Sequence, residues 1–147
     1  MSVRRGSRSG DRLRSRRAGR RVALAAVFEA EFGQRTATAV LERQLAETEA
    51  DPGTAELARA LVVAVVTNRE AIDALIGMTA SQYPVTQLAR MDRALLRCAI
   101  GEVLHSATPA RVAIAEWVEL ARTYSGDPMR RLMNGVLGRI ARDTGGA

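Results

Sequence analysis

The side chains best suited to nucleophilic chemistry are a single cysteine and a single histidine. Cys98 and His105 are the only residues of their kinds in the 147-residue chain. On one helix their spacing of seven positions places them two turns and about 10 Å apart, too far for direct proton transfer. Two residues also provide too few ligands for a Cys/His zinc site. The lone cysteine allows no internal disulfide and is typical of a reducing compartment.

A second pair that could do acid/base chemistry is Glu116 and Glu119, three positions apart on an expected helix. Neighbouring carboxylates transfer protons where a pocket holds them against a substrate. No polar partner for such a pocket accompanies this pair, and the chain has no glycine-rich loop that would cradle a phosphate. We therefore predict that the chain is not an enzyme and uses no cofactor or metal.

The strongest chemical signal is a cluster of arginines near the N-terminus. Residues 1–21 hold nine arginines and one acid, a net charge of +8, whereas the other 126 residues hold 13 arginines and 15 acids, a net charge of −2. Arginine binds phosphates in a bidentate manner and stacks on unpaired bases, and arginine-rich segments often become ordered on RNA. The alternative is a solvated tail without a function. The candidate RNA contacts are Arg12, Arg14, Arg16, Arg17, Arg20 and Arg21.

The elements that position these residues are expected to be helices. Hydrophobic residues make up 47% of the chain and aromatic residues only 3%, so the core must be built from small aliphatic side chains, which suits closely packed helices. We predict an all-α fold in which a disordered basic arm, residues 1–13, precedes a single domain, residues 14–147. The expected helices cover about 14–32, 36–47, 54–76, 85–105, 109–124 and 128–142. The apolar run that follows the arginines is too short to span a membrane.

Two features of the later helices suggest structural roles. Arg97 and Glu102 lie on an otherwise apolar helix, and buried charges need partners. We predict a bridge from Arg97 to Glu116, with Asn134 taking part, that joins the last three long helices. Asn134 and Gly135 form a dipeptide typical of a hairpin turn, yet they lie in a helical pattern of apolar residues. Gly135 is either a tolerated flaw in that helix or a point of close packing.

Three stretches in order along the chain resemble one known family. They are "MDRALLRCAIGEVL", "TPARVAIAEWVELARTYSGD" and "RLMNGVLGRI", and an arginine-rich helix start precedes them. Together they are similar to the NusB family of bacterial transcription antitermination factors. The resemblance implies a compact bundle of about six to seven helices in two subdomains. It also implies binding of boxA-like single-stranded RNA together with the small ribosomal protein NusE, in the cytoplasm and as part of the RNA polymerase antitermination complex.

The resemblance also implies roles for particular residues. The family's RNA-binding arginine pattern falls on Arg16, Arg17, Arg20 and Arg21. Its Leu-Arg pattern falls on Leu96 and Arg97, its helix glutamate on Glu116, and its Asn-Gly pair on Asn134 and Gly135. Because Asn-Gly recurs inside the family's last helix, the resemblance favours close packing at Gly135. This chain departs from the family's usual residues at Phe28, Gly101, Ala115 and Gly138.

Two other functions remain possible at this stage. A helical structural or dimerisation protein with a passive basic tail would have the same composition, and a homodimer is left open. The same helical module also resembles the RNA-binding domain of some ribosomal RNA cytosine methyltransferases. That second function would require a catalytic domain, which these 147 residues do not contain.

Overall fold

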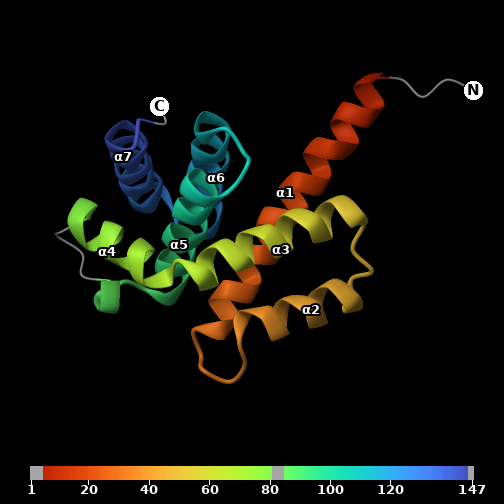
Figure 1. Cartoon of the computed structure of the whole chain (residues 1–147), viewed down its shortest axis with the longest axis horizontal. Coiled ribbons are helices and arrows are strands. Elements are labelled where there is room, and N and C mark those ends of the chain that lie inside the picture. Colours follow the sequence, from red (N-terminus) through yellow and green to blue (C-terminus); the bar gives the residue numbers. More distant parts are fainter. Residues whose placement is uncertain (1–4, 81–84, 146–147) are drawn as a thin grey trace, which may run out of the picture. The chain divides into compact units, whose positions relative to one another are not determined.

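A computed structural model describes residues 5–80 and 85–145, and within these ranges every regular element is a helix (Figure 1). The predicted all-α fold class is therefore confirmed. The elements are α1 (Arg5–Ala30), α2 (Ala37–Glu47), α3 (Pro52–Thr67), α4 (Arg69–Thr79), the short 3-10 helix η1 (Val85–Gln87), α5 (Arg90–His105), α6 (Ala110–Tyr124) and α7 (Asp127–Asp143).

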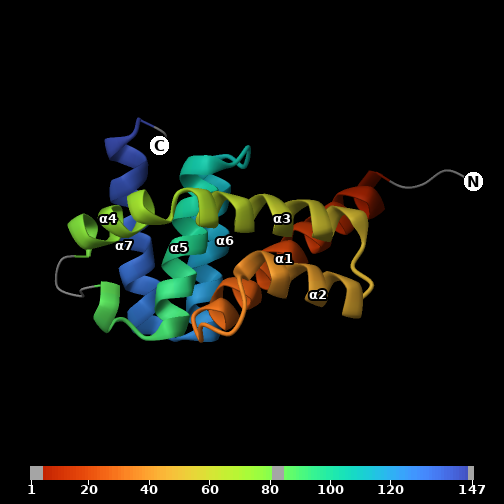
Figure 2. The same cartoon turned by 60° about the horizontal axis from the view of Figure 1, so that its bottom comes forward.

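The chain divides into two compact units between Val62 and Val63. The first unit holds α1, α2 and most of α3, and α1 lies beside α2 within it (Figure 1). In the second unit α5, α6 and α7 pack on one another, and α4 packs on α5 and α7 (Figure 2). This division agrees with the two subdomains that the family resemblance implies. None of the helices in the described ranges has both the length and the apolar character needed to cross a membrane.

Helix α1 begins at Arg5, earlier than the expected start near Arg14. Arginine has a high helix propensity, and the only acid of the segment, Asp11, pairs with Arg14 one turn further on. The basic segment can therefore continue the helix. Residue 13, the expected boundary between the basic arm and the domain, lies inside α1. Disorder of residues 1–13 in solution stays a prediction.

The helix expected over residues 54–76 is wrong in one respect, because it is two helices. The break falls at Asn68, whose side-chain nitrogen donates to the Ala64 carbonyl at 2.8 Å. The Asn68 backbone, with φ at −112° and ψ at 18°, departs from α-helical values, and asparagine has a low propensity for helix interiors. The first of the two helices also begins earlier than expected, at Pro52, because Asp51 caps it and accepts from the Thr54 N–H at 3.2 Å.

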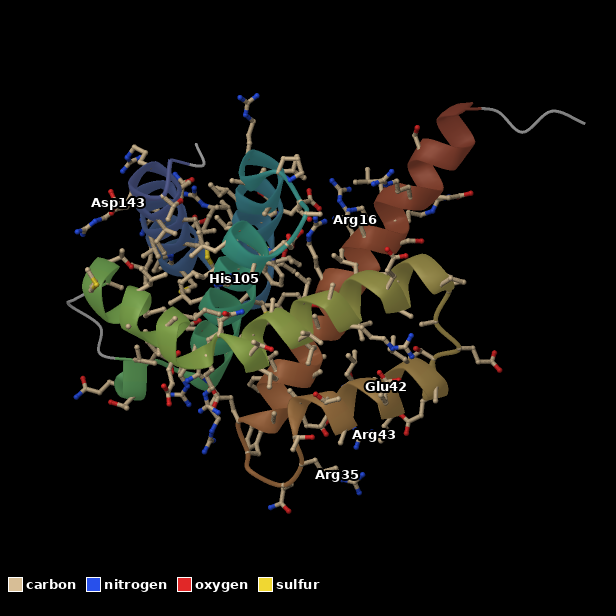
Figure 3. The ribbon with its side chains drawn as sticks, in the orientation of Figure 1. Arg16, Arg35, Glu42, Arg43, His105 and Asp143 are labelled. Carbon is tan, nitrogen blue, oxygen red and sulfur yellow. The ribbon has the colours of Figure 1, made fainter. Side chains whose placement is uncertain are left out.

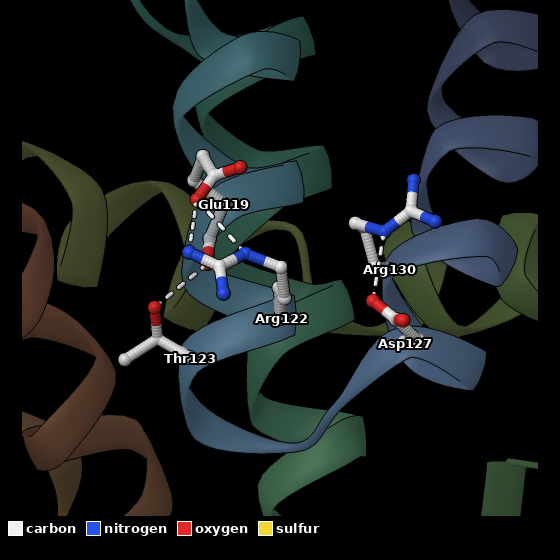
Figure 4. A network of polar contacts seen from close by, with 5 residues as sticks. All are labelled: Glu119, Arg122, Thr123, Asp127 and Arg130. Carbon is white, nitrogen blue, oxygen red and sulfur yellow. Dashed lines mark hydrogen bonds and ion pairs between the residues drawn. The ribbon is translucent and has the colours of Figure 1, made fainter.

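The last two helices each begin one position away from the start expected from the sequence, at Ala110 and at Asp127. Pro109 is itself the N-cap of α6, and no side chain caps that helix. Helix α7 starts at Asp127, and Gly126, with φ at +137°, is its N-cap. The Asp127 carboxylate accepts instead from Arg130 Nε at 3.2 Å, as Figure 4 shows. In both cases a proline lies within one position of the helix start.

The buried Arg97 of the second unit has a partner that the prediction did not include, and the bridge to Glu116 stays a prediction. The Arg97 guanidinium donates to both carboxylate oxygens of Asp73 on α4, at 2.8 and 2.9 Å. Glu116 is only half-buried and Asn134 is exposed, whereas Glu102 is fully buried and accepts from Trp117 Nε1 at 2.7 Å.

Gly135 lies within α7 and is exposed, so the turn suggested by its sequence does not form. A Cβ atom added at Gly135 would meet no other atom within 4 Å. The expected close packing at Gly135 is therefore wrong for the described residues of this chain. The core is formed by the opposite face of α7, which includes Met133, Val136 and Leu137.

Candidate nucleic-acid interface

The arginines of α1 form two rows along the helix. Arg14, Arg17 and Arg21 follow the spacing i, i+3, i+7, and all three are exposed. The spacing i, i+4, i+8 defines the other row, Arg12, Arg16 and Arg20. At 3.6 residues per turn the rows lie on roughly opposite sides of α1. A nucleic acid strand that follows α1 therefore meets one row at a time.

The second row is not uniformly available to a ligand. Arg12 is exposed and Arg16 is half-buried, and the Arg16 side chain is labelled on α1 in Figure 3. Arg20 is only 1% exposed. As a surface contact for RNA, Arg20 is thus a wrong prediction for this structure, since its guanidinium lies inside the protein. Spacing along the sequence shows which arginines share a face but not which face is covered.

The exposed row opens onto a shallow hollow of about 590 Å³ within the first unit. The residues that line it are Asp11, Arg14, Ser15, Arg17, Ala18, Arg21 and Asp51. Three guanidinium groups and two carboxylates thus share one surface. Such a surface attracts phosphates through its arginines, and the two carboxylates limit where along α1 a phosphate can bind.

Asp51 connects the hollow to the first turn of α3. Its carboxylate accepts hydrogen bonds from the Thr54 hydroxyl at 2.5 Å and from the Ser15 hydroxyl at 2.7 Å. These bonds, the one from Thr54 foremost, lower the pKa of Asp51 to about 2. Asp51 therefore stays charged near neutral pH, caps α3 and holds the arginine-bearing part of α1. Sequence reasoning missed both Ser15 and Asp51, although Asp51-Pro52 is a helix-start signal.

The same part of α1 crosses α3 at very short range because two glycines permit it. A Cβ atom at Gly19 would lie 3.0 Å from both the Leu57 Cβ and the Thr54 carbonyl oxygen. A Cβ atom at Gly53 would lie 3.1 Å from the Ser15 Cβ. Since contacts this short are rare for a real Cβ atom, a larger residue at either position would require its neighbours to shift, and at Gly19 one of those neighbours is backbone. The close crossing of α1 and α3 therefore determines the direction in which the exposed arginines of α1 point.

The candidate catalytic pairs do not form a reactive site. Cys98 is fully buried, and burial raises the pKa of its thiol, so the thiolate that a nucleophile needs is disfavoured. His105 is exposed at the end of α5. Glu119 accepts from Arg122 Nη2 at 2.8 Å in a surface pair (Figure 4). Within the described ranges no cluster of acidic, cysteine and histidine side chains suits a metal ion.

Comparison with known proteins identifies the family. A model of the NusB family matches residues 17–142. The chain belongs to the NusB family. The transcription antitermination protein NusB of Dehalococcoides mccartyi is 39% identical over 129 residues, which cover 87% of this chain and 90% of that protein. The family consists of antitermination factors rather than enzymes, in agreement with the sequence analysis.

Solved structures support the same NusB fold. The NusB of T. maritima is 32% identical and superposes with a TM-score of 0.80 over 87% of this chain and 91% of that one. A structure of the antitermination factors NusB and NusE in complex with double-stranded RNA is 22% identical, with a TM-score of 0.76 over 88% of this chain and 98% of that one. At that identity the second likeness supports the fold alone.

Proposed function

We propose that this NusB family member is a non-enzymatic transcription antitermination factor that binds boxA-like single-stranded RNA together with ribosomal protein NusE. It would act in the cytoplasm, within the RNA polymerase antitermination complex that transcribes ribosomal RNA. Membership of the family over residues 17–142 carries this proposal. A structure of NusB and NusE in complex with double-stranded RNA has the same fold, and we extend both kinds of partner to this chain as part of the proposal.

The exposed row of arginines supports an RNA-binding role for α1. Arg14, Arg17 and Arg21 project from the helix beside the hollow, where their guanidinium groups can each pair with a phosphate oxygen. These arginines lie on a helix that is bonded to α3 through Ser15 and Asp51. This position favours an RNA-binding role over that of a passive basic tail. We propose this row as the phosphate-binding part of the interface.

Binding of RNA across a salt series tests the proposal. Each phosphate contact that is lost should reduce the slope of log K against log salt by about 0.7 for a single strand. We therefore expect the double variant Arg17→Gln, Arg21→Gln to bind boxA-like RNA more weakly, with a slope reduced by about 1.4. Arg69→Gln removes an exposed arginine from α4 and serves as the matched control. Parallel slopes for all three proteins would refute phosphate binding by α1.

Specificity and the protein partner need a second comparison. BoxA-like RNA should bind more tightly than a scrambled RNA of the same length, and NusE should increase that preference. Equal weak binding of both RNAs, with and without NusE, would contradict the antitermination function. A homodimer stays a prediction, and sedimentation of the free protein over a concentration series would detect it.

A further inference from the structure

The face of α1 that carries the exposed arginines continues past them to an aromatic pair. Phe28 lies seven positions after Arg21 and Phe32 lies eleven after it, which keeps both on the same side of the helix. Helix α1 ends at Ala30, but the turn persists, because the Phe32 N–H donates to the Glu29 carbonyl at 3.1 Å. The arginine row and the aromatic pair thus lie along the same side of the first unit, and we call them together the strip.

The rings of Phe28 and Phe32 pack against each other. Their centroids are 5.3 Å apart and their planes meet at 85°, an edge-to-face contact. Phe28 is half-buried, whereas Phe32 is 48% exposed. They are the only phenylalanines in the chain. Phe32 therefore presents a large aromatic surface to solvent while Phe28 holds its ring in place.

A positive charge follows directly after this pair. Arg35 is exposed in the loop between α1 and α2, three positions after Phe32, and is labelled there in Figure 3. Gly33, with φ at +76°, makes the turn that separates the two residues. An exposed aromatic ring with a guanidinium group at each end of the strip suits a single strand, whose bases stack on aromatics while its phosphates pair with arginines.

We propose that Phe32 is a stacking site for one unpaired base of the RNA strand whose phosphates bind Arg14, Arg17 and Arg21. This inference rests on the proposed function and adds a base-binding position to it. Phe28 braces the ring, and Arg35 pairs with the phosphate next to the stacked base. The strip from Arg21 to Phe32 is about 16 Å long, so the stacked base lies a few nucleotides from the last arginine-bound phosphate.

The test uses boxA-like single-stranded RNA with 2-aminopurine at one position at a time, because stacking quenches the fluorescence of that base. We expect strong quenching at one position with the full-length protein. Phe32→Ala should abolish this quenching and weaken binding about tenfold, with an unchanged salt slope because no charge is lost. Phe32→Tyr should retain both signals. Met78→Ala, which removes a side chain 66% exposed on α4, should change neither.

Several outcomes separate this inference from the proposed function. Arg35→Gln should reduce the salt slope by about 0.7 and leave the quenching in place. If Phe32→Ala binds and quenches like the parent while the Arg17, Arg21 variant loses affinity, stacking is refuted and RNA binding stands. If Phe32→Ala weakens only the binding of NusE, the residue belongs to a protein contact and the inference is wrong. If the parent protein binds no RNA, both proposals fail. Matching melting temperatures establish that each variant is folded.

Discussion

The Ser15 hydroxyl donates to the Asp51 carboxylate at 2.7 Å and thereby ties the arginine-bearing helix α1 to the capped start of α3. The two residues are 36 positions apart in sequence, so this bond is a tertiary contact within the first unit. It lies at the edge of the hollow that the exposed arginines share. The position of the exposed arginines in the candidate interface thus depends on Ser15 and Asp51, which would not themselves attract a phosphate.

Ser15→Ala should loosen the basic part of α1 without disturbing the cap of α3. We expect the melting temperature to fall by roughly 1 to 3 °C, because one hydrogen bond at the surface is lost. Hydrogen exchange of the amides before Ser15 should become faster. Ser9→Ala is the matched control, since Ser9 is an exposed serine on the same helix. Equal exchange in both variants would show that the bond does not hold α1.

The stability of the protein should depend on the charge of Asp51 in acid. The folded-state pKa of about 2 lies below the ordinary value of 3.8, so the ionised carboxylate stabilises the fold above about pH 4. That contribution is lost as pH falls from about 4 to 2. We therefore expect Asp51→Asn to melt below the parent at pH 5 to 7, with the difference shrinking towards pH 2. A difference that stays constant across this range would contradict the low pKa.

Alanine at two helical glycines should have opposite effects on stability. Gly135→Ala should stabilise by up to about 1 kcal/mol, because the new methyl group meets open space and alanine favours the helix. Gly19→Ala should destabilise by about 1 to 3 kcal/mol, because its Cβ would press on Leu57 and on the Thr54 carbonyl. Urea unfolding measures both signs. A destabilised Gly135→Ala would restore the close-packing interpretation.

The ion pair between Arg97 and Asp73 should contribute more to the free energy of unfolding than an ion pair at the surface. Asp73→Asn removes a carboxylate charge from the ion pair with Arg97, whose side chain is 7% exposed, and we expect a loss of about 3 kcal/mol. Glu119→Gln removes a carboxylate from a surface pair with Arg122 and should cost less than about 1 kcal/mol. Denaturant unfolding of the two variants compares them. Equal small losses would mean that water screens Arg97 as well.

Local signals in the sequence were sufficient for much of the fold. Thr36 before α2 and Gly33 after α1 lie where the pattern predicted them, and the apolar stripe of α7 was recognised despite Asn134 and Gly135. Such signals depend on residues within one or two turns of each other. Helix type and approximate extent are therefore accessible from sequence, whereas the periodicity of apolar residues does not show the break at Asn68, where φ is −112°.

Contacts between distant residues were much less accessible. Arg97 was correctly chosen as a buried charge, but its partner Asp73 could be found only after the break in the preceding helix was known. The arginines of α1 were found from charge alone, yet Arg20 is buried and Ser15 and Asp51 were overlooked. Composition identifies the class of ligand, whereas the packing of α1 on α3 decides which side chains can reach it.

The burial of Trp117 and Cys98 has a consequence for how the two units can be observed. The chain has one tryptophan and one cysteine, and both lie in the second unit. Intrinsic fluorescence and thiol labelling therefore report on that unit alone, whereas far-ultraviolet circular dichroism records the helices of both. Coincident midpoints would mean that the units melt as one cooperative body. An earlier loss of ellipticity would identify the first unit as a part that opens independently, without a change in the fluorescence or thiol signals of the second unit.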